Sequence, residues 1–409
     1  MFDEIQFEKI NQLPKYVFAA IDELKDQAKE NGRDVVDFSM GNPDQDTPKV
    51  IVDSLILHVK DVGKGRHGYS AGSGKGVLEL RQAICTWYKK KYDVDIDVER
   101  EAVATMGSKE GFYHMVQAIT NAGDIAIVPD PTYPIHAYAF SINGAKPVGV
   151  KVPFNEENYE VDEAQYLADL RSTIEQQDTH VKYVLVNFPH NPSTATVTLD
   201  FYEKLVALAK ELRFYVISDI AYADIAFDGY KTPSILQVEG AKDVAVEAYT
   251  LSKSYNMAGW RVGFLVGNRS LVGALQKLKS WIDYGMFTPI QLAAADAITK
   301  YQYIADDETS PRYEKRRNFL VKAFNDAGWK IGTPKASMFV WARIPDVCKY
   351  MGSLKFSEEL IKKADVAVSP GIAFGDDDYV RIALIADEEN MQRAADNIKK
   401  FLEKVKKSK

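Results

Sequence analysis

Six short apolar runs, which alternate with amphipathic helical stretches, constrain the fold of this 409-residue chain more than any other sequence feature. The runs are rich in Val and Ile and lie at residues 102–106, 124–128, 182–186, 214–218, 244–249 and 262–266. This alternation is typical of a mainly parallel sheet flanked by helices. The sequence therefore predicts an α/β protein, and its length allows a large domain together with a smaller one.

Polar and aromatic residues follow the first three runs, at the edge of the predicted sheet where open α/β proteins bind ligands. Ser108 opens a helix in GSKEGFYHMV, and the free N–H groups at a helix start suit a phosphate. Tyr133, in PDPTYPIHAY, either stacks its ring on a planar cofactor or serves as a core residue. Asn191, in NFPHNPSTA, either directs its amide at a ligand or forms an Asn-Pro turn.

Two ionisable residues follow later runs. Asp219 comes directly after the apolar stretch FYVIS, with Tyr222 three residues further on. A carboxylate there is costly to desolvate unless it meets a cationic partner, and a protonated ring nitrogen is such a partner. Lys253, in TLSKSYNMAGWRVG, is a candidate for Schiff-base chemistry with a carbonyl cofactor, against the alternative of a solvated loop lysine.

The charges and the residues that commonly bind metals narrow the choice of ligand. The formal net charge is −7 with no basic stripe, and the tail KKFLEKVKKSK has the spacing of a solvated helix face, so nucleic acid is not expected as a partner. Cys85 and Cys348 form no CxxC pair or disulfide framework, and the six histidines form no HExxH-like pattern. We therefore expect an organic cofactor and no metal.

The hydropathy of the chain predicts no membrane segment. No uninterrupted apolar stretch has the length of a bilayer span, and the N-terminal sequence MFDEIQFEKI is charged rather than signal-like. A chain with neither feature is expected to remain in the cytoplasm.

A phosphate-binding turn, a stacking ring, two hydrogen-bonding groups, a carboxylate and an amine form a complete set for holding pyridoxal phosphate. With NFPHNP, SDIAY and TLSKSYNMAGWRVG in this order, the chain resembles, over essentially its whole length, the class I and II aminotransferases of the fold type I pyridoxal-phosphate superfamily. Within this family it is most similar to bacterial glutamate-pyruvate (alanine) aminotransferases, through DFSMGNPD, HGYS, GSKEG, DYGMFTP, PKASMFVWA and VSPGIAFG. The aspartate and LL-diaminopimelate aminotransferases share much of this pattern.

The resemblance implies roles for the residues around the cofactor ring. Lys253 would bind the cofactor covalently and, once displaced by substrate, would carry the proton between the substrate Cα and the cofactor. Asp219 would keep the pyridine nitrogen protonated, so that the ring withdraws electrons. Tyr222 and Asn191 would hydrogen-bond the phenolic oxygen of the cofactor, and Tyr133 would stack on the face of its ring.

The resemblance also implies a phosphate site and a second subunit. Five residues would hold the cofactor phosphate, the first two by backbone and the rest by side chain: Ser108, Lys109, Thr250, Ser252 and Arg261. Arg261 lies eight residues after Lys253, as in the family. A guanidinium is able to donate two parallel hydrogen bonds to the oxygens of a phosphate. Tyr69, in HGYSAGSGKG, matches a tyrosine that in relatives reaches the phosphate of the other subunit, which implies a homodimer.

For the substrate, Arg381 in the apolar segment DDDYVRIALIA would bind the α-carboxylate. Gly41 would add a backbone N–H, Asn191 would also contact the substrate, and Tyr16 would close over the pocket. No arginine occurs in DYGMFTP, where one branch of the family binds the distal carboxylate of its substrate. Another branch uses a lysine at the position of Lys109, which would serve glutamate and 2-oxoglutarate and leave room for alanine and pyruvate.

By the same resemblance, residues 47–300 would form the large pyridoxal-phosphate-binding domain, with a mainly parallel mixed sheet between helices. Residues 1–46 would join residues 301–409 in a smaller α/β domain. The expected reaction is reversible amino transfer between L-alanine and 2-oxoglutarate, giving pyruvate and L-glutamate, with aspartate or LL-diaminopimelate aminotransferase as alternatives.

Two further classes share this scaffold. A pyridoxal-phosphate-dependent C–S lyase would release pyruvate without needing a 2-oxo acid, so dependence of turnover on 2-oxoglutarate separates it from an aminotransferase. A non-catalytic effector-binding domain of a transcription regulator would need a fused DNA-binding module and would tolerate loss of the catalytic lysine.

Overall fold

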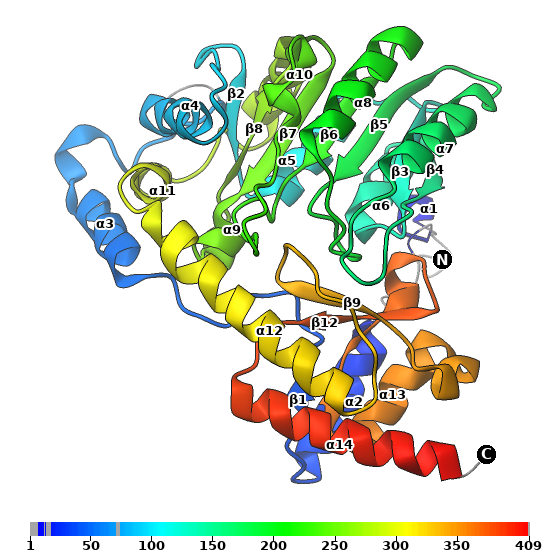
Figure 1. The fold of residues 1–409 in the computed structure, drawn as a ribbon. Coiled ribbons are helices and arrows are strands. Elements are labelled where there is room, and N and C mark those ends of the chain that lie inside the picture. Colours follow the sequence, from blue (N-terminus) through cyan, green and yellow to red (C-terminus); the bar gives the residue numbers. More distant parts are fainter. Residues whose placement is uncertain (1–6, 12, 14–17, 71–73, 408–409) are drawn as a thin grey trace, which may run out of the picture.

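The computed structural model describes residues 7–11, 13, 18–70 and 74–407. A seven-stranded sheet with helices on both faces forms the larger part, and a second group of strands and helices packs beneath it in the view of Figure 1. The α/β fold expected from the sequence is confirmed.

The large sheet has the strand order β2-β8-β7-β6-β5-β3-β4. β8 runs antiparallel to β2 and β7, and the other pairs are parallel. Six strands match the predicted apolar runs. β4 was not predicted, because this edge strand reads KPVGVK and is mostly exposed or half-buried. The bounds are β2 (Ala102–Thr105), β3 (Ile125–Asp130), β4 (Lys146–Lys151), β5 (Val181–Asn187), β6 (Tyr215–Asp219), β7 (Ala245–Thr250) and β8 (Gly263–Gly267).

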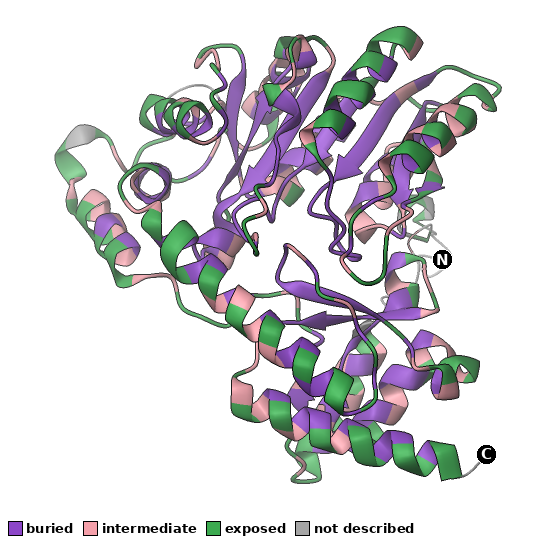
Figure 2. Cartoon of the chain, viewed as in Figure 1, coloured by how far each residue is buried: buried purple, intermediate pink, exposed green. Residues whose placement is uncertain are grey.

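Alternate residues of the strands pack against two different helix layers. Val103 lies in the apolar cluster formed with α5, α6 and α10, whereas Ala104 lies in the cluster formed with α4, α7 and α8. The strands are therefore buried on both faces, while the helices bury one side and expose the other (Figure 2). These helices are α4 (Leu78–Tyr92), α5 (Ser108–Ile119), α6 (Pro134–Ile142), α7 (Glu163–Glu175), α8 (Leu199–Leu212) and α10 (Arg269–Ile282).

The second group combines both ends of the described chain. Val36 pairs with Val366 in the short parallel ladder of β1 and β10, and α2 packs against α13. An antiparallel sheet of order β11-β12-β9 faces the large sheet. A division of the chain at residues 47 and 300 stays a prediction. The elements are α2 (Phe18–Glu30), β1 (Val36–Asp37), α12 (Ser310–Asp326), β9 (Phe339–Arg343), α13 (Gly352–Ala364), β10 (Val366–Ala367), β11 (Ser369–Pro370), β12 (Tyr379–Ala383) and α14 (Glu388–Lys407).

The connection between β7 and β8 has a direct consequence for function. It contains only the one-turn helix α9 (Leu251–Ser254) and the 3-10 turn η5 (Ala258–Trp260), and so lacks the long helix that usually crosses the sheet between parallel strands. β8 therefore turns back antiparallel, and α9 stays at the carboxyl end of β7, between the two groups (Figure 1).

Among the described residues, none of the helices combines the length and the apolar character that crossing a bilayer requires.

The remaining elements of the described chain are α1 (Glu8–Asn11), α3 (Lys49–Lys60), η2 (Val62–Lys64), η3 (Ile235–Gln237), η4 (Ala241–Asp243), α11 (Thr288–Thr299), the π-helical turn η6 (Ile304–Thr309), η7 (Asp346–Met351) and η8 (Gly371–Phe374).

Candidate active site

A pocket of about 640 Å³ opens at the carboxyl ends of β5, β6 and β7, where the large sheet faces β9 and β12. Most residues that the sequence predicted to bind cofactor or substrate line this pocket. Tyr69 lies outside it, and Tyr16 lies outside the described residues. The predicted residues that line the pocket are Gly41, Ser108, Lys109, Tyr133, Asn191, Asp219, Tyr222, Thr250, Ser252, Lys253, Arg261 and Arg381.

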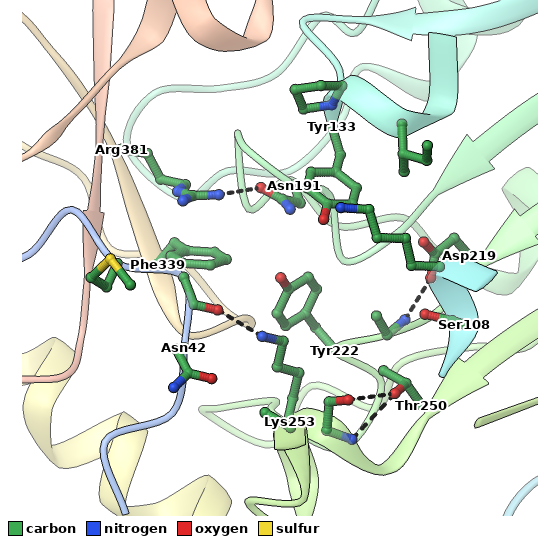
Figure 3. Close-up of a pocket in the computed structure, with 18 of the residues that line it drawn as sticks. Asn42, Ser108, Tyr133, Asn191, Asp219, Tyr222, Thr250, Lys253, Phe339 and Arg381 are labelled. Carbon is green, nitrogen blue, oxygen red and sulfur yellow. Dashed lines mark hydrogen bonds between the residues drawn. The ribbon is translucent and has the colours of Figure 1, made fainter. Parts of the chain in front are cut away.

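Lys253 projects into the pocket from α9 (Figure 3). Its Nζ donates a hydrogen bond to the carbonyl oxygen of Gly41, 2.7 Å away. Burial, together with the positive charges of Arg381 and Arg261, lowers the pKa of Lys253 from 10.5 to about 8. A lysine with this pKa offers an appreciable fraction of neutral amine near neutral pH, which nucleophilic attack on a carbonyl group requires.

Asp219 ends β6 and lies at the opposite end of the pocket from Arg381, with Tyr222 between them (Figure 3). Its Oδ1 accepts a hydrogen bond from the backbone N–H of Ala221 at 3.1 Å, and its Oδ2 lies 3.0 Å from Nε2 of His136. Because an ionised carboxylate only accepts, Nε2 of His136 is the donor. The carboxylate is thus held in one orientation, as the partner of a protonated ring nitrogen requires.

His136 and Asn187 support Asp219, and neither was predicted. His136 is 1% exposed and lies in the first turn of α6. The sequence feature that could have indicated its role is its position one turn after Tyr133 in YPIHAY. Asn187 donates from Nδ2 to the carbonyl oxygen of Asp219 at 2.7 Å, and its Oδ1 accepts from the backbone N–H of Asn191 at 2.9 Å. The sequence feature that could have indicated the role of Asn187 is a single amide side chain at the end of a buried strand.

Three segments converge on an anion site at the start of α5. Ser108 is the first residue of α5, and the first N–H groups of a helix have no partner within it. Thr250 Oγ1 donates to Ser252 Oγ at 2.8 Å, and Arg261 Nη1 donates to the same oxygen at 3.4 Å. Gly107 has a φ of 80°, and any side chain at this position would clash with Arg261, because its Cβ would lie 2.5 Å from Nη2. Helix N–H groups, hydroxyls and a guanidinium together fit a phosphate.

Two tyrosines face the interior of the pocket (Figure 3). Nζ of Lys109 lies 5.5 Å from the ring centre of Tyr133, a cation–π arrangement. The ring of Tyr222 meets that of Phe339 edge-on, with centroids 5.5 Å apart. Burial raises the pKa of Tyr222, so its phenol stays protonated and is able to donate a hydrogen bond.

Arg381 enters the pocket from β12 and is 5% exposed. Its Nη1 donates to Oδ1 of Asn191 at 3.0 Å, and its guanidinium carbon lies 4.2 Å from the ring centre of Phe339 and 4.6 Å from that of Phe374. A planar guanidinium held between two rings has a fixed orientation, in which it is able to donate two parallel hydrogen bonds to a carboxylate. Neither phenylalanine was predicted as a pocket residue, because an apolar residue within PKASMFVWA or SPGIAFG equally indicates core.

Tyr69 lies on the surface and is 89% exposed. Its ring centroid lies 5.5 Å from that of Tyr284, just after α10, where Trp281 is 82% exposed. The segment that carries Tyr69 is attached through Gln291, whose Nε2 donates to Ser70 Oγ at 2.9 Å. Tyr69 therefore does not contribute to the pocket of its own chain.

One group of possible metal ligands among the described residues lies outside the pocket and consists of Glu110, His114 and Asp283. The ammonium of Lys279 is fully buried and lies 2.9 Å from Glu110 Oε1 and 2.8 Å from Asp283 Oδ2. This lysine already compensates the two carboxylates, so the group forms a buried ion-pair cluster.

The residues of the pocket fit pyridoxal phosphate. One cavity contains an anion site, a tyrosine ring, an oriented carboxylate and an amine of lowered pKa, which match the phosphate, the ring face, the ring nitrogen and the aldehyde of that cofactor. Arg381 adds a separate site for a carboxylate in the same cavity.

Comparison with known proteins gives consistent matches along the whole chain. The family model for aminotransferases of class I and II matches residues 33–398. Glutamate-pyruvate aminotransferase AlaC of Escherichia coli is 47% identical over 97% of this chain and 93% of its own, and an LL-diaminopimelate aminotransferase of Halothermothrix orenii is 38% identical over 96% and 97%. The substrate-bound structure of BacF from Bacillus subtilis superposes with a TM-score of 0.87 at 32% identity, covering 97% of this chain and 98% of that chain.

Proposed function

Because this chain belongs to the class I and II aminotransferases, which depend on pyridoxal phosphate, we propose that it catalyses reversible amino transfer between L-alanine and 2-oxoglutarate, giving pyruvate and L-glutamate. The observation that carries this choice is the 47% identity with the relative named glutamate-pyruvate aminotransferase. A pocket with Arg381 for an α-carboxylate and Lys109 as a second cation is compatible with both amino acids.

Lys253 is the proposed catalytic base. When bound, pyridoxal phosphate supplies an aldehyde that reacts with amines and a protonated ring that stabilises negative charge on the substrate Cα. Lys253 would hold the cofactor covalently through Nζ, and the same nitrogen, once free, would carry the proton from the substrate Cα to the cofactor. A pKa of about 8 suits an amine that accepts and donates protons near neutral pH.

Attachment of pyridoxal phosphate to the cofactor-free enzyme should accelerate as the pH rises toward about 8 and then level off. Only the neutral amine attacks a carbonyl carbon, and the neutral fraction of Lys253 increases as the pH rises through its pKa of about 8. Stopped-flow absorbance from about pH 6 to about pH 10 measures this rate. A rate that keeps rising through the upper end of this range would contradict the lowered pKa.

The geometry around Lys253 supports the other proposed cofactor contacts. Asp219, oriented by His136, would pair with the ring nitrogen and keep it protonated. Tyr222 and Asn191 would hydrogen-bond the phenolic oxygen, and Tyr133 would stack on the ring face. The start of α5 and the side chains of Thr250, Ser252 and Arg261 would hold the phosphate.

Arg381 binds the α-carboxylate that every amino-acid substrate shares. Its guanidinium is fixed by Asn191 and by the two flanking phenylalanine rings, so it does not have to be ordered when the substrate arrives. The backbone of Gly41 lies close to this guanidinium, because a Cβ on Gly41 would be 3.3 Å from Nη2 of Arg381. Glycine at this position lets the backbone approach the bound carboxylate closely.

Lys109 is the proposed partner of the distal carboxylate of glutamate and 2-oxoglutarate. Its ammonium lies over the ring of Tyr133 in the pocket lining, and no acidic side chain of the described residues pairs with it. Lys109 is an exposed residue at the pocket lining, and its charge there favours an anionic substrate end without filling the space that alanine and pyruvate need.

Replacing Lys109 with alanine should raise KM for glutamate and 2-oxoglutarate about tenfold or more, while KM for alanine changes by less than about twofold. The reason is that only the longer substrates carry a second carboxylate. Steady-state kinetics with both amino acids measures the difference, and Lys109→Arg, which retains the charge, is the matched control. A proportional loss for alanine would show that Lys109 supports the cofactor instead.

The substrate pair is tested by half-reactions. Enzyme loaded with pyridoxal phosphate is mixed with alanine, glutamate, aspartate or LL-diaminopimelate, and the conversion of the cofactor to its amine form is followed by absorbance. Fast conversion by alanine and glutamate supports the proposal. Dominance of LL-diaminopimelate would favour the second candidate, which relatives of that name at 38% identity support. Continued pyruvate release from a sulfur-containing amino acid such as cystathionine, over many turnovers and without any 2-oxo acid, would indicate a lyase.

We also propose that two copies of this chain form a homodimer, in which Tyr69 reaches the phosphate site of the partner subunit. The support is the 89% exposure of Tyr69 beside the exposed side chains of Trp281 and Tyr284. Sedimentation velocity tests the assembly, and a monomer at assay concentrations would contradict it.

A further inference from the structure

A buried carboxylate lies behind the pocket, on the side of the large sheet that α4 covers. Asp224 comes two residues after Tyr222 and five after Asp219, and its side chain is 0% exposed. Nζ of Lys91, on α4, forms an ion pair with Asp224 Oδ1. Asp224 does not line the pocket, and none of the roles proposed above involves it.

Asp224 also accepts a hydrogen bond from the phenol of Tyr249 at Oδ2. Burial alone would raise the pKa of Asp224, but Lys91 and the surrounding hydroxyl groups hold it below its usual value, so the group is an ionised acceptor. The Tyr249 hydroxyl lies 3.2 Å from Oγ of Ser254. Because the single phenolic proton goes to Asp224, the Ser254 hydroxyl is the donor to Tyr249.

Ser254 is the residue directly after Lys253, on a helix that needs external support. α9 has only four residues. An isolated helical turn is unstable, because the loss of backbone entropy on forming the first turn outweighs the free energy of its hydrogen bonds. Its start is capped by Thr250, whose Oγ1 accepts from the N–H of Ser252 at 3.2 Å. Its end is held by the contact from Ser254 to Tyr249.

Asp224 therefore connects two pieces of the pocket that are far apart in sequence. One piece is the turn that carries Tyr222, and the other is the helix that carries Lys253. The ring of Tyr249 is itself packed between Trp87 of α4, at a centroid distance of 4.7 Å, and Phe264 of β8, at 5.0 Å. The connection is thus built on the rigid centre of the sheet.

We propose that Asp224 and Tyr249 are positioning residues that fix Lys253 relative to Tyr222 through Ser254. The inference rests on the roles proposed above for those two pocket residues. Lys253 must reach the substrate Cα while Tyr222 holds the cofactor oxygen, and a displacement of about 1 Å in such a site costs on the order of a hundredfold in rate. A hydrogen-bonded ionic cluster behind the sheet holds this spacing without occupying the pocket.

Tyr249→Phe tests the proposal against a matched control, Tyr88→Phe. Tyr88 also donates a buried phenolic hydrogen bond to a carboxylate, Glu247 Oε1, at 2.9 Å, but among the described residues its phenol forms no hydrogen bond to α9 or to the turn that carries Tyr222. Tyr249→Phe loses two buried hydrogen bonds and Tyr88→Phe loses one, so both variants should lose some thermal stability. Only Tyr249→Phe should lower kcat, by about tenfold or more, with KM for alanine nearly unchanged.

Only Tyr249→Phe should also shift the pH titration of the visible absorbance of the lysine-bound cofactor, a readout that requires no turnover. A second variant, Ser254→Ala, leaves the contact between Asp224 and Tyr249 intact and should change kcat and the titration in the same direction at little cost in stability. The proposal is overturned if Tyr249→Phe and Ser254→Ala keep the wild-type titration and kcat, or if Tyr88→Phe changes them equally. Absence of the visible band in the wild type would instead refute the role of Lys253.

Discussion

Replacing Lys253 with alanine should abolish both the visible absorbance of the lysine-bound cofactor and amino transfer. Loss of a general base alone slows a proton transfer by about 10²- to 10⁴-fold, and loss of the covalent attachment adds to this. Among the described residues that line the pocket, the only other lysine is Lys109, whose Nζ lies over the ring of Tyr133. Absorbance spectra of the loaded enzyme and coupled assays with alanine and 2-oxoglutarate measure the two losses.

Lys109→Ala is the control for this experiment, because it removes a second lysine from the same pocket without removing the catalytic base. It should retain the visible band. Transamination by Lys253→Ala at a rate near that of the wild type would refute the assignment on which the mechanism depends. Rescue of Lys253→Ala by a small primary amine would support it, since the missing function is that of a free amine.

The large sheet was predictable because its central strands are buried on both faces. Such strands are apolar throughout, as the run at residues 182–186 is, and they remain recognisable without any knowledge of their neighbours. β4 carries lysines at both ends and is mostly exposed or half-buried, so its sequence lacks this signal, whereas the other edge strand, β2, is buried throughout. Burial, and not the place of a strand in the sheet, therefore explains the one missed strand of the large sheet and the success with the other six.

The pocket residues of the large sheet were predictable for a related reason. Asp219 and Lys253 follow buried strands directly, and the carboxyl ends of these strands meet at one edge of the sheet. The role of Arg381 came instead from the family resemblance, because nothing local indicates that β12 faces β6 and β7 across a pocket. That arrangement arises from packing between distant parts of the chain.

Residues that support the pocket from behind could not be recognised in the sequence. Phe339 lies on β9 and has the signature of a core residue, yet its ring contacts both Arg381 and Tyr222. His136 becomes informative only when the structure places its Nε2 3.0 Å from Asp219. Contacts of this kind depend on side-chain direction across several elements, which neither hydrophobic periodicity nor motif spacing specifies.

The change Asp219→Asn is expected to slow cleavage of the substrate Cα–H bond by about a hundredfold or more while the cofactor remains attached to Lys253. Asparagine preserves the shape of the side chain but is neutral, so it cannot stabilise the positive charge of a protonated ring nitrogen. The electrons of the Cα–H bond then lose the acceptor that makes the proton removable. Single-turnover release of deuterium from alanine labelled at Cα measures this step separately from product release.

Glu247→Gln provides the control for that charge change when both variants are measured at a pH above the value of about 7 to which burial raises the pKa of Glu247. Glu247 is also a buried carboxylate at the centre of the sheet, on β7 beside β6, and it accepts hydrogen bonds from Tyr88 and Ser234 without lining the pocket. If loss of any buried charge in this sheet disturbed the active site, both variants would slow deuterium release equally, and the pairing of Asp219 with the ring would be refuted. If Asp219→Asn alone is slow while its visible band persists, the carboxylate acts on the cofactor ring and not on the fold.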